Sequence, residues 1–273
     1  MVIKEALMLG TSLLSDVSDT PGLDSKILLE KACNCDRLFL LRNRDEEISE
    51  ENFLIYKSFL ERRKSNEPIA YITNEKEFMG LLFYVDKNVL IPRPDTEILA
   101  EYAISNCRGK ILDIGTGSGA LSVSIAKLGK DVSVSACDIS EAALSIAEKN
   151  ALSNGVSVNF FRCDILKDEL NEKYDAIISN PPYIRSDVVL TLDRNVKDFE
   201  PSLALDGGDD GLIFYRTITK KAYDALNSGG ILAYEIGFDQ GKDVSDIMKP
   251  LFDDVKILKD FAGNDRVVTG IKK

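Results

Sequence analysis

The sequence predicts an open, mostly parallel α/β sheet preceded by a small helical domain. From about Lys110 onward, short β-branched segments alternate with amphipathic ones, which is the pattern of repeated strand–helix units. Before residue 74, apolar residues recur instead at three- and four-residue spacing, as in packed helices. We therefore expect a helical domain at 1–73, a linker with a β-hairpin at 74–95, and a Rossmann-like domain at 96–273.

The amino-terminal region contains three helical patterns and one hairpin pattern. The helices are predicted at 3–14, 21–33, where proline stands at the start, and 49–66. The segments "EKEFMG" and "LLFYVD" predict two strands joined by a turn at Gly80. The stretch "NVLIPRPDTEILAEYAIS" then predicts a loop that enters a helix.

The remainder of the chain supplies the sheet. Strands are predicted at 110–115, 132–138, 158–164, 174–179 and 231–237, and two closing strands at 254–260 and 266–273. Helices are predicted at 120–129, 140–155, 211–230 and 241–252. The strands that alternate with helices should be parallel, and the last two should form an antiparallel edge.

Composition limits the class of protein. Hydrophobic residues make up 44% of the chain and charged residues 29%, which is ordinary for a globular protein. No apolar run is long enough to span a membrane and the amino terminus does not resemble a secretory signal, so we expect a cytoplasmic protein with no membrane partner. The net charge of −11 disfavours direct binding to nucleic acid.

The chain has five cysteines and no histidine. The cysteines are Cys33, Cys35, Cys107, Cys137 and Cys163. Their scatter and the absence of histidine favour structural thiols over a metal site, so no metal is expected. Any catalysis must also proceed without an imidazole base, which favours a reaction that needs no strong base.

A glycine-rich loop follows the strand at 110–115. Asp113-Ile114-Gly115-Thr116-Gly117-Ser118-Gly119 leads from this strand directly into a helix, which is the context in which such loops bind ligands. Glycines allow the backbone to approach a ligand closely. The spacing G-x-G-x-G differs from the dinucleotide fingerprint, and the loop lacks the Lys-Ser/Thr ending of a phosphate-binding loop, so an NTPase is not expected.

Three residues at strand ends are candidate ligand contacts. Asp138 ends the next strand, where a carboxylate accepts hydrogen bonds from both hydroxyls of a ribose. Asp113 either faces the ligand or caps the glycine loop. Ile165 follows Asp164 after the third strand and either contacts a base or belongs to the core.

The corner "SNPPYI" follows the fourth strand at the carboxyl edge of the sheet. Prolines stiffen this corner, and the side-chain carbonyl of Asn180 and the backbone carbonyl of Pro181 can both accept hydrogen bonds from a planar –NH2 group. Tyr183 would pack against the plane of that group. Holding a weakly nucleophilic nitrogen in line with an electrophilic methyl group is worth about 7–11 kcal/mol. Asn180, Pro181 and Tyr183 are the predicted catalytic residues, and Pro182 is predicted to contact the substrate with them.

Together these motifs resemble a known family. G-x-G-x-G, the following Asp and N-P-P-Y are similar to class I S-adenosylmethionine-dependent methyltransferases that modify exocyclic or amide nitrogen. The segments "EPIAYIT", "IPRPDTE", "FEPSLALDGGDDGL" and "KDFAGNDRVV" resemble, more specifically, the peptide-chain release factor N5-glutamine methyltransferases of the PrmC/HemK family. This resemblance covers essentially the whole chain.

The resemblance implies a substrate, a cofactor and a partner. The substrate is the side-chain amide of the glutamine in the Gly-Gly-Gln motif of class I, bacterial-type release factors, and the cofactor is S-adenosyl-L-methionine. Cofactor contacts are implied for Gly115, Thr116, Gly117, Ser118, Gly119, Asp138, Ile165 and Asn180, and substrate contacts for residues 180–183. The helical domain would bind the release factor.

Other functions stay open at this point. They are glutamine methylation of a ribosomal protein, adenine-N6 methylation of nucleic acid, and a binding module without activity. The sequence also leaves open whether Arg93, Glu97 and Glu200 have site roles or structural ones.

Overall fold

The computed structural model describes all 273 residues, which form two compact units. The smaller unit comprises Met1–Glu75 with Asp193–Phe199, and the larger comprises Lys76–Leu192 with Glu200–Lys273. None of the helices combines the length and the apolar character needed to cross a bilayer.

The smaller unit is a bundle of helices, and the three predicted in it are confirmed. The helices are α1 (Ile3–Leu14), α2 (Pro21–Cys33), α3 (Arg37–Arg42), α4 (Glu50–Lys64), α5 (Ile69–Thr73) and the short α10 (Arg194–Lys197). Tyr56 of α4 is fully buried in the core, with its hydroxyl 2.7 Å from Ser25 Oγ of α2. Gly10 of α1 makes room for it, because a Cβ there would lie 1.9 Å from the Tyr56 hydroxyl oxygen.

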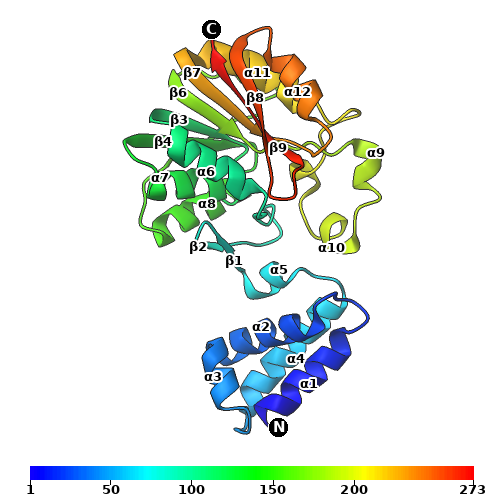
Figure 1. The fold of residues 1–273 in the computed structure, drawn as a ribbon. Helices are drawn as coiled ribbons and strands as arrows, with labels where there is room; N and C mark the ends of the chain where they lie inside the picture. Colours follow the sequence, from blue (N-terminus) through cyan, green and yellow to red (C-terminus); the bar gives the residue numbers. More distant parts are fainter. The chain divides into compact units, whose positions relative to one another are not determined.

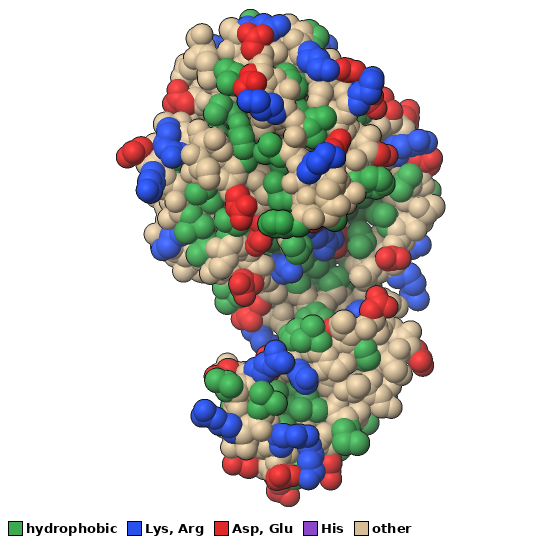
Figure 2. Space-filling view, in the orientation of Figure 1, with side chains coloured by type: hydrophobic (Ala, Val, Ile, Leu, Met, Phe, Trp, Pro, Cys, Tyr) green, Lys and Arg blue, Asp and Glu red, His purple; other side chains and the backbone are tan.

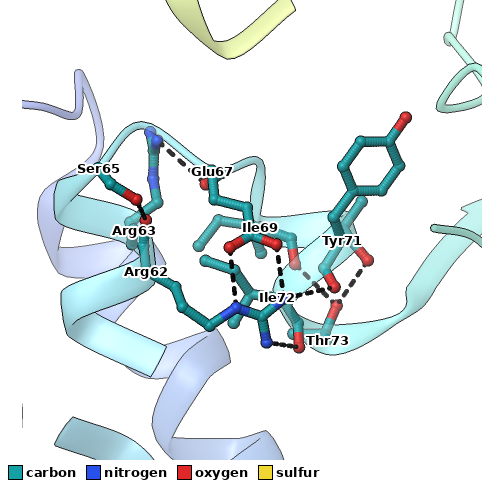
Figure 3. A network of polar contacts seen from close by, with 9 residues as sticks. Arg62, Arg63, Ser65, Glu67, Ile69, Tyr71, Ile72 and Thr73 are labelled. Carbon is teal, nitrogen blue, oxygen red and sulfur yellow. Dashed lines mark hydrogen bonds and ion pairs between the residues drawn. The ribbon is translucent and has the colours of Figure 1, made fainter. Parts of the chain in front are cut away.

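The junction between α4 and α5 is fixed by one arginine. Arg62 Nε donates to Glu67 Oε2 at 2.8 Å, and its Nη2 donates to Glu67 Oε1 at 2.5 Å and to the Tyr71 carbonyl at 3.3 Å (Figure 3). The guanidinium therefore links the end of one helix to carbonyl groups of the next. The segment "EPIAYIT" thus has a structural task, which is to set the direction in which the chain leaves α4.

The larger unit contains a seven-stranded sheet in the order β5-β4-β3-β6-β7-β9-β8 (Figure 1). Its strands are β3 (Gly109–Ile114), β4 (Val132–Asp138), β5 (Asn159–Arg162), β6 (Tyr174–Ser179), β7 (Leu226–Glu235), β8 (Phe252–Lys259) and β9 (Asp265–Lys272). Strands β3 to β7 pair in parallel, and β9 pairs antiparallel with both β7 and β8. The predicted mostly parallel sheet with an antiparallel carboxyl-terminal edge is confirmed.

Helices cover both faces of this sheet. They are α6 (Thr96–Asn106), α7 (Ala120–Leu128), α8 (Glu141–Ser153), α11 (Ile213–Ala225) and α12 (Gly241–Met248). The short α9 (Ser186–Val189) and a 3-10 turn at Ser202–Ala204 lie in the connection between β6 and α11. One core packs α6 and α7 against side chains such as Ile111 and Ile178. The other packs α11 and α12 against side chains such as Leu112 and Ile177. Neighbouring residues of a strand thus face opposite cores, which explains the nearly continuous apolar strands.

The predicted hairpin at 74–95 comprises β1 (Glu75–Phe78) and β2 (Leu81–Tyr84). From Lys76 onward it belongs to the larger unit. Asn150 of α8 holds β2 with two hydrogen bonds: its Oδ1 accepts from Tyr84 N at 2.7 Å and its Nδ2 donates to Tyr84 O at 2.9 Å. This segment is therefore packed onto the sheet domain.

One strand begins earlier than predicted. The prediction places "NSGG" at the end of a helix, but α11 ends at Ala225 and β7 already begins at Leu226. Leu226 pairs with Tyr174, and the register then shifts before Ala176 pairs with Ile231. Gly229, at φ +75°, lies in this irregular stretch. The turn-forming residues therefore form a bulge within the strand.

Candidate functional site

A cavity of about 360 Å³ lies at the carboxyl edge of the parallel strands. The ends of β3, β4 and β6 coincide there, because Ile114 pairs with both Cys137 and Ser179. Of the predicted site residues, Gly115, Gly117, Asp138, Ile165, Asn180, Pro181 and Pro182 line the cavity. Asp113, Thr116, Ser118, Gly119 and Tyr183 lie close to it in the chain but are not part of its lining.

The three glycines of the loop after β3 have different structural tasks. All three have positive φ, at 75° for Gly115, 55° for Gly117 and 79° for Gly119. A Cβ on Gly115 or Gly117 would meet nothing, so these positions leave the backbone open to a ligand in the cavity. A Cβ on Gly119 would lie 3.1 Å from Ala147 Cβ, so this glycine allows α7 to approach α8.

Asp138 braces the glycine loop and also faces the cavity. Its Oδ2 accepts from Gly117 N and its Oδ1 from Ser140 N, both at 2.9 Å. Burial raises the pKa of this carboxyl, while the backbone N–H donors oppose the shift. An ionised carboxylate can accept about four hydrogen bonds, so each oxygen retains capacity for one more donor from a ligand.

Asp113 is fully buried beneath the loop. Its Oδ2 accepts from Thr116 Oγ1 at 2.7 Å, and Thr116 Oγ1 is also 2.7 Å from Ser122 Oγ. Its Oδ1 is buried and has no hydrogen-bond partner. Of the two alternatives that the sequence leaves open for Asp113, this arrangement favours a brace for the loop. Burial raises the pKa of Asp113 to about 7.

This raised pKa makes stability depend on pH. Because the folded-state pKa is about 7 and the ordinary value 3.8, the stabilising contribution is complete below about pH 4 and is lost as pH rises through 7. We expect Asp113→Asn to increase the free energy of unfolding at pH 8 by up to about 4 kcal/mol and to change it much less at pH 4. The melting temperatures of the wild-type protein and of Asp113→Asn, each at pH 4 and at pH 8, measure this effect. If the two proteins differ in melting temperature by the same amount at both pH values, the prediction is contradicted.

The remaining walls of the cavity are largely apolar. Ile165 is both a lining residue and a member of the core beneath α11, so its two proposed tasks are compatible. Phe214 and Ile218 of α11 line the same region, and Leu203 and Ala204 line the cavity from the loop before α11. A flat, partly apolar ring system matches walls of this kind.

The N-P-P-Y corner is held by its backbone and by one side chain. Asn180 Nδ2 donates to Thr96 Oγ1 at 3.2 Å. The carbonyl of Tyr183 accepts from Gln240 Nε2 at 3.0 Å. The Tyr183 ring packs against the core beneath α11, and burial raises its pKa to about 12. The phenol therefore stays neutral at physiological pH.

The segment "FEPSLALDGGDDGL" lies against this corner. Ile184 N donates to the Leu205 carbonyl at 3.0 Å, and Gly207 N donates to the Ile184 carbonyl at 2.8 Å. A Cβ on Gly207 would lie 2.8 Å from both Pro182 O and Tyr183 Cα. The two backbones therefore touch without an intervening side chain.

Arg93, Glu97 and Glu200 now have structural explanations. Arg93 forms an ion pair with Glu200, whose side chain is 1% exposed and whose Oε2 also accepts from Ile91 N at 3.3 Å. This pair links the loop before α6 to the loop before the 3-10 turn, and both loops contribute to the cavity wall. Glu97 Oε1 accepts from Met79 N at 2.8 Å and so holds the hairpin.

Two residues near Asn180 were missed by the sequence reasoning. Thr96 begins α6 and accepts from Asn180 Nδ2, and Glu235 ends β7 with a carboxylate whose charged form the Thr96 and Asn180 side chains stabilise. A signal for Glu235 exists in "ILAYEIG", because a lone acidic residue ends an apolar strand there as Asp138 does in β4. For Thr96 the sequence has no comparable signal.

Comparison with known proteins assigns the family. Residues 94–196 match the methyltransferase small domain and residues 5–73 match the PrmC N-terminal domain. The release factor glutamine methyltransferase of Clostridium acetobutylicum is 45% identical over 100% of this chain and 99% of its own length. That of Clostridium botulinum is 40% identical over the full length of both.

A solved structure supports the fold. A methyltransferase from Pyrococcus furiosus superposes with a TM-score of 0.54 over 79% of this chain and 97% of its own, at 21% identity. The predicted methyltransferase fold is confirmed by this likeness and by the matching domain. With full-length relatives at 40% identity and above, the chain belongs to the family of release factor glutamine methyltransferases.

Proposed function

We propose that this protein transfers a methyl group from S-adenosyl-L-methionine to the side-chain amide nitrogen of the glutamine in the Gly-Gly-Gln motif of class I, bacterial-type release factors. The observation that carries this proposal is the side-chain amide of Asn180, which lines the cavity and whose Nδ2 already donates to Thr96 Oγ1. Its Oδ1 is thereby directed to another donor, and an amide –NH2 is such a donor. Family membership supplies the identity of the acceptor.

The residues of the cavity fit this cofactor. The free acceptor capacity of Asp138 suits the two ribose hydroxyls, the open backbone at Gly115 and Gly117 suits the amino acid portion, and the apolar wall at Ile165 suits adenine. When bound, S-adenosylmethionine supplies an electrophilic methyl group on a sulfonium sulfur. The chain itself positions the acceptor nitrogen.

The proposed mechanism relies on positioning and on charge. Asn180 Oδ1 and the Pro181 carbonyl accept the two hydrogens of the acceptor –NH2 and hold its nitrogen in line with the methyl group. When the methyl group leaves the sulfonium sulfur for the acceptor, the nitrogen would become positive, and the two carbonyl oxygens would stabilise that charge. The nitrogen then loses one proton to water. No imidazole base is needed, which agrees with a chain that has no histidine.

The smaller unit is proposed to bind the release factor. Its visible face carries hydrophobic side chains among lysines and arginines (Figure 2). Leu38, Leu41 and Leu54 are each more than half exposed, and Arg37 and Arg42 flank the first two on α3. Exposed apolar residues with charged neighbours are typical of protein-binding surfaces. Because its acceptor acts in translation, we infer that the enzyme works in the cytoplasm.

Methyl transfer to purified acceptors tests the proposed function. Wild-type protein is incubated with methyl-labelled S-adenosylmethionine and a release factor, and the glutamine-bearing peptide is analysed by mass spectrometry. We expect one added methyl group on the glutamine, and none when this glutamine is replaced by alanine. Label on a ribosomal protein, DNA or RNA, with none on the release factor, would overturn the proposal.

Asp138→Ala tests the cofactor site separately. We expect the Kd for S-adenosylmethionine to rise about tenfold to a hundredfold, because the variant loses charged hydrogen bonds to the ribose and the brace on Gly117. Isothermal titration calorimetry measures this. The exposed pair Lys242–Asp246 provides a control, since Asp246→Ala removes a carboxylate on α12 that is not part of the cavity lining. Unchanged affinity in Asp138→Ala would refute the assignment of the ribose site.

A further inference from the structure

Two side chains face the Asn180 amide from α6 and β7. Asn180 Nδ2 donates to Thr96 Oγ1 at 3.2 Å. Because Ser179 pairs with Tyr234, the Glu235 carboxylate lies next to Asn180, and the Thr96 and Asn180 side chains both stabilise its charged form. Thr96 begins α6 and Glu235 ends β7, so separate parts of the larger unit converge on one side-chain amide.

We propose that Glu235, with Thr96, is a positioning residue that fixes the orientation of the Asn180 amide; the inference rests on the proposed function. A half-turn of an asparagine side chain exchanges its acceptor oxygen with its donor nitrogen at little steric cost. The Glu235 carboxylate accepts only, so it binds Nδ2 and disfavours Oδ1 at the same place. Thr96 accepts from Nδ2, which leaves its own hydroxyl hydrogen for Glu235. Oδ1 is then the atom left for the acceptor glutamine.

Core packing alone does not explain why a carboxyl group is buried at position 235. The residue is 2% exposed and its Oε2 has no hydrogen-bond partner. The titratable and charged groups that face it are Asp95 at the start of α6, Arg266 on β9, Tyr183 after β6 and Tyr215 on α11. Burying an incompletely paired carboxyl group opposes folding, and such groups concentrate at functional sites.

Arg266 connects this cluster to the start of α6. Its Nη2 lies 3.1 Å from Asp95 Oδ2 and 3.1 Å from Asp260 Oδ2. Asp95 immediately precedes Thr96, so the ion pair fixes the first turn of α6 and with it the Thr96 hydroxyl. The segments "IPRPDTE" and "KDFAGNDRVV" thus meet behind the Asn180 amide.

The protonation state of Glu235 determines whether it can act in this way. Burial raises the pKa of Glu235 to about 7. Below that pH the carboxyl carries a proton and becomes a donor, which can bind Asn180 Oδ1 and favour the reversed amide. We therefore expect kcat to fall as pH drops below about 7.

Four single variants test the proposal. Glu235→Gln keeps the shape of the side chain but can donate to Asn180 Oδ1, and Thr96→Val removes the hydroxyl group. Each variant should lower kcat about tenfold to a hundredfold and leave the KM for the release factor nearly unchanged. Thr96→Ser keeps the hydroxyl and should retain kcat. Thr219→Val is the matched control. Thr219 on α11 is buried, as Thr96 is, and its hydroxyl contacts the Tyr234 hydroxyl on β7 but not Asn180.

Two further readouts separate positioning from a general loss of structure. In Glu235→Gln the decline of kcat below about pH 7 should vanish, because residue 235 no longer titrates. The double variant Asn180→Asp with Glu235→Gln restores a donor–acceptor pair, but with the roles exchanged: residue 235 now donates and residue 180 accepts. It should be at least about tenfold more active than Asn180→Asp alone, as expected for residues that act as a pair.

The possible outcomes are distinct. If wild-type enzyme methylates the glutamine and Glu235→Gln keeps kcat within about twofold, the positioning proposal fails while the proposed function stands. It fails too if the only effects of Glu235→Gln are a lower melting temperature and a weaker cofactor affinity, no different from those of the control Thr219→Val. It also fails if kcat of Glu235→Gln still declines below about pH 7. If wild-type enzyme does not methylate the release factor, the proposed function fails first.

Discussion

Replacing Asn180 with alanine is expected to lower kcat for release factor methylation by at least about two orders of magnitude. The variant loses the side-chain acceptor that holds the substrate –NH2 and stabilises its developing charge. Affinity for S-adenosylmethionine should stay within about tenfold, because the loss falls mainly on the chemical step. Single-turnover kinetics gives the rate of methyl transfer, and calorimetry gives the affinity.

The same variant distinguishes catalysis from binding. Asp138→Ala provides the complementary case, in which cofactor affinity should fall more than the single-turnover rate at saturating cofactor. If Asn180→Ala retains full activity, the proposed mechanism is wrong. If it binds the cofactor more than a hundredfold more weakly, Asn180 is mainly a cofactor contact and the assignment of its role is wrong.

Gly207→Ala should be the most damaging change outside the cavity lining. A Cβ at this position would lie 2.8 Å from Pro182 O and Tyr183 Cα, both of which are backbone atoms that cannot rotate away. The N-P-P-Y corner must then move, and a shift of about 1 Å in a reacting group can cost about a hundredfold in rate. We expect kcat to fall by that amount.

Its neighbour provides the control. Gly208→Ala introduces strain, because φ is +87°, but the new Cβ would lie 3.4 Å from Ile213 Cγ2 and would not meet the corner. We expect it to cost about 1 kcal/mol of stability and to leave kcat nearly unchanged. Equal loss of kcat in the two variants would show that the loop is merely strained, and would contradict the proposed support of the corner.

The positions of strands and helices in the larger unit were largely predictable from local sequence. Alternation of "KILDIG", "VSVSACD" and "YDAIIS" with amphipathic segments specifies buried parallel strands, and parallel strands have their carboxyl ends at one edge. Gly115, Gly117, Asp138 and Asn180 therefore could be expected at one place. The bulge in β7 was not predictable, because "NSGG" has the same residues as an ordinary turn.

The partners of individual side chains were much less accessible from sequence. Asp113 looked equally suited to a ligand or to the loop, and only its contact with Thr116 favours the loop. Thr96 lies 84 residues from Asn180, and no local pattern encodes their hydrogen bond. Such contacts depend on which strands become neighbours and on the register of each pair, and propensity and periodicity do not specify these.

The place of β9 in the sheet has a consequence for synthesis of the protein. β9 lies between β7 and β8, and β8 pairs with no other strand. While the chain grows, β8 is made before its partner exists and the edge of β7 beside Glu235 stays open. Arg266 also arrives only with β9. A nascent chain that stops short of residue 265 therefore has every motif that binds cofactor, yet lacks the strand that completes the support of its catalytic amide.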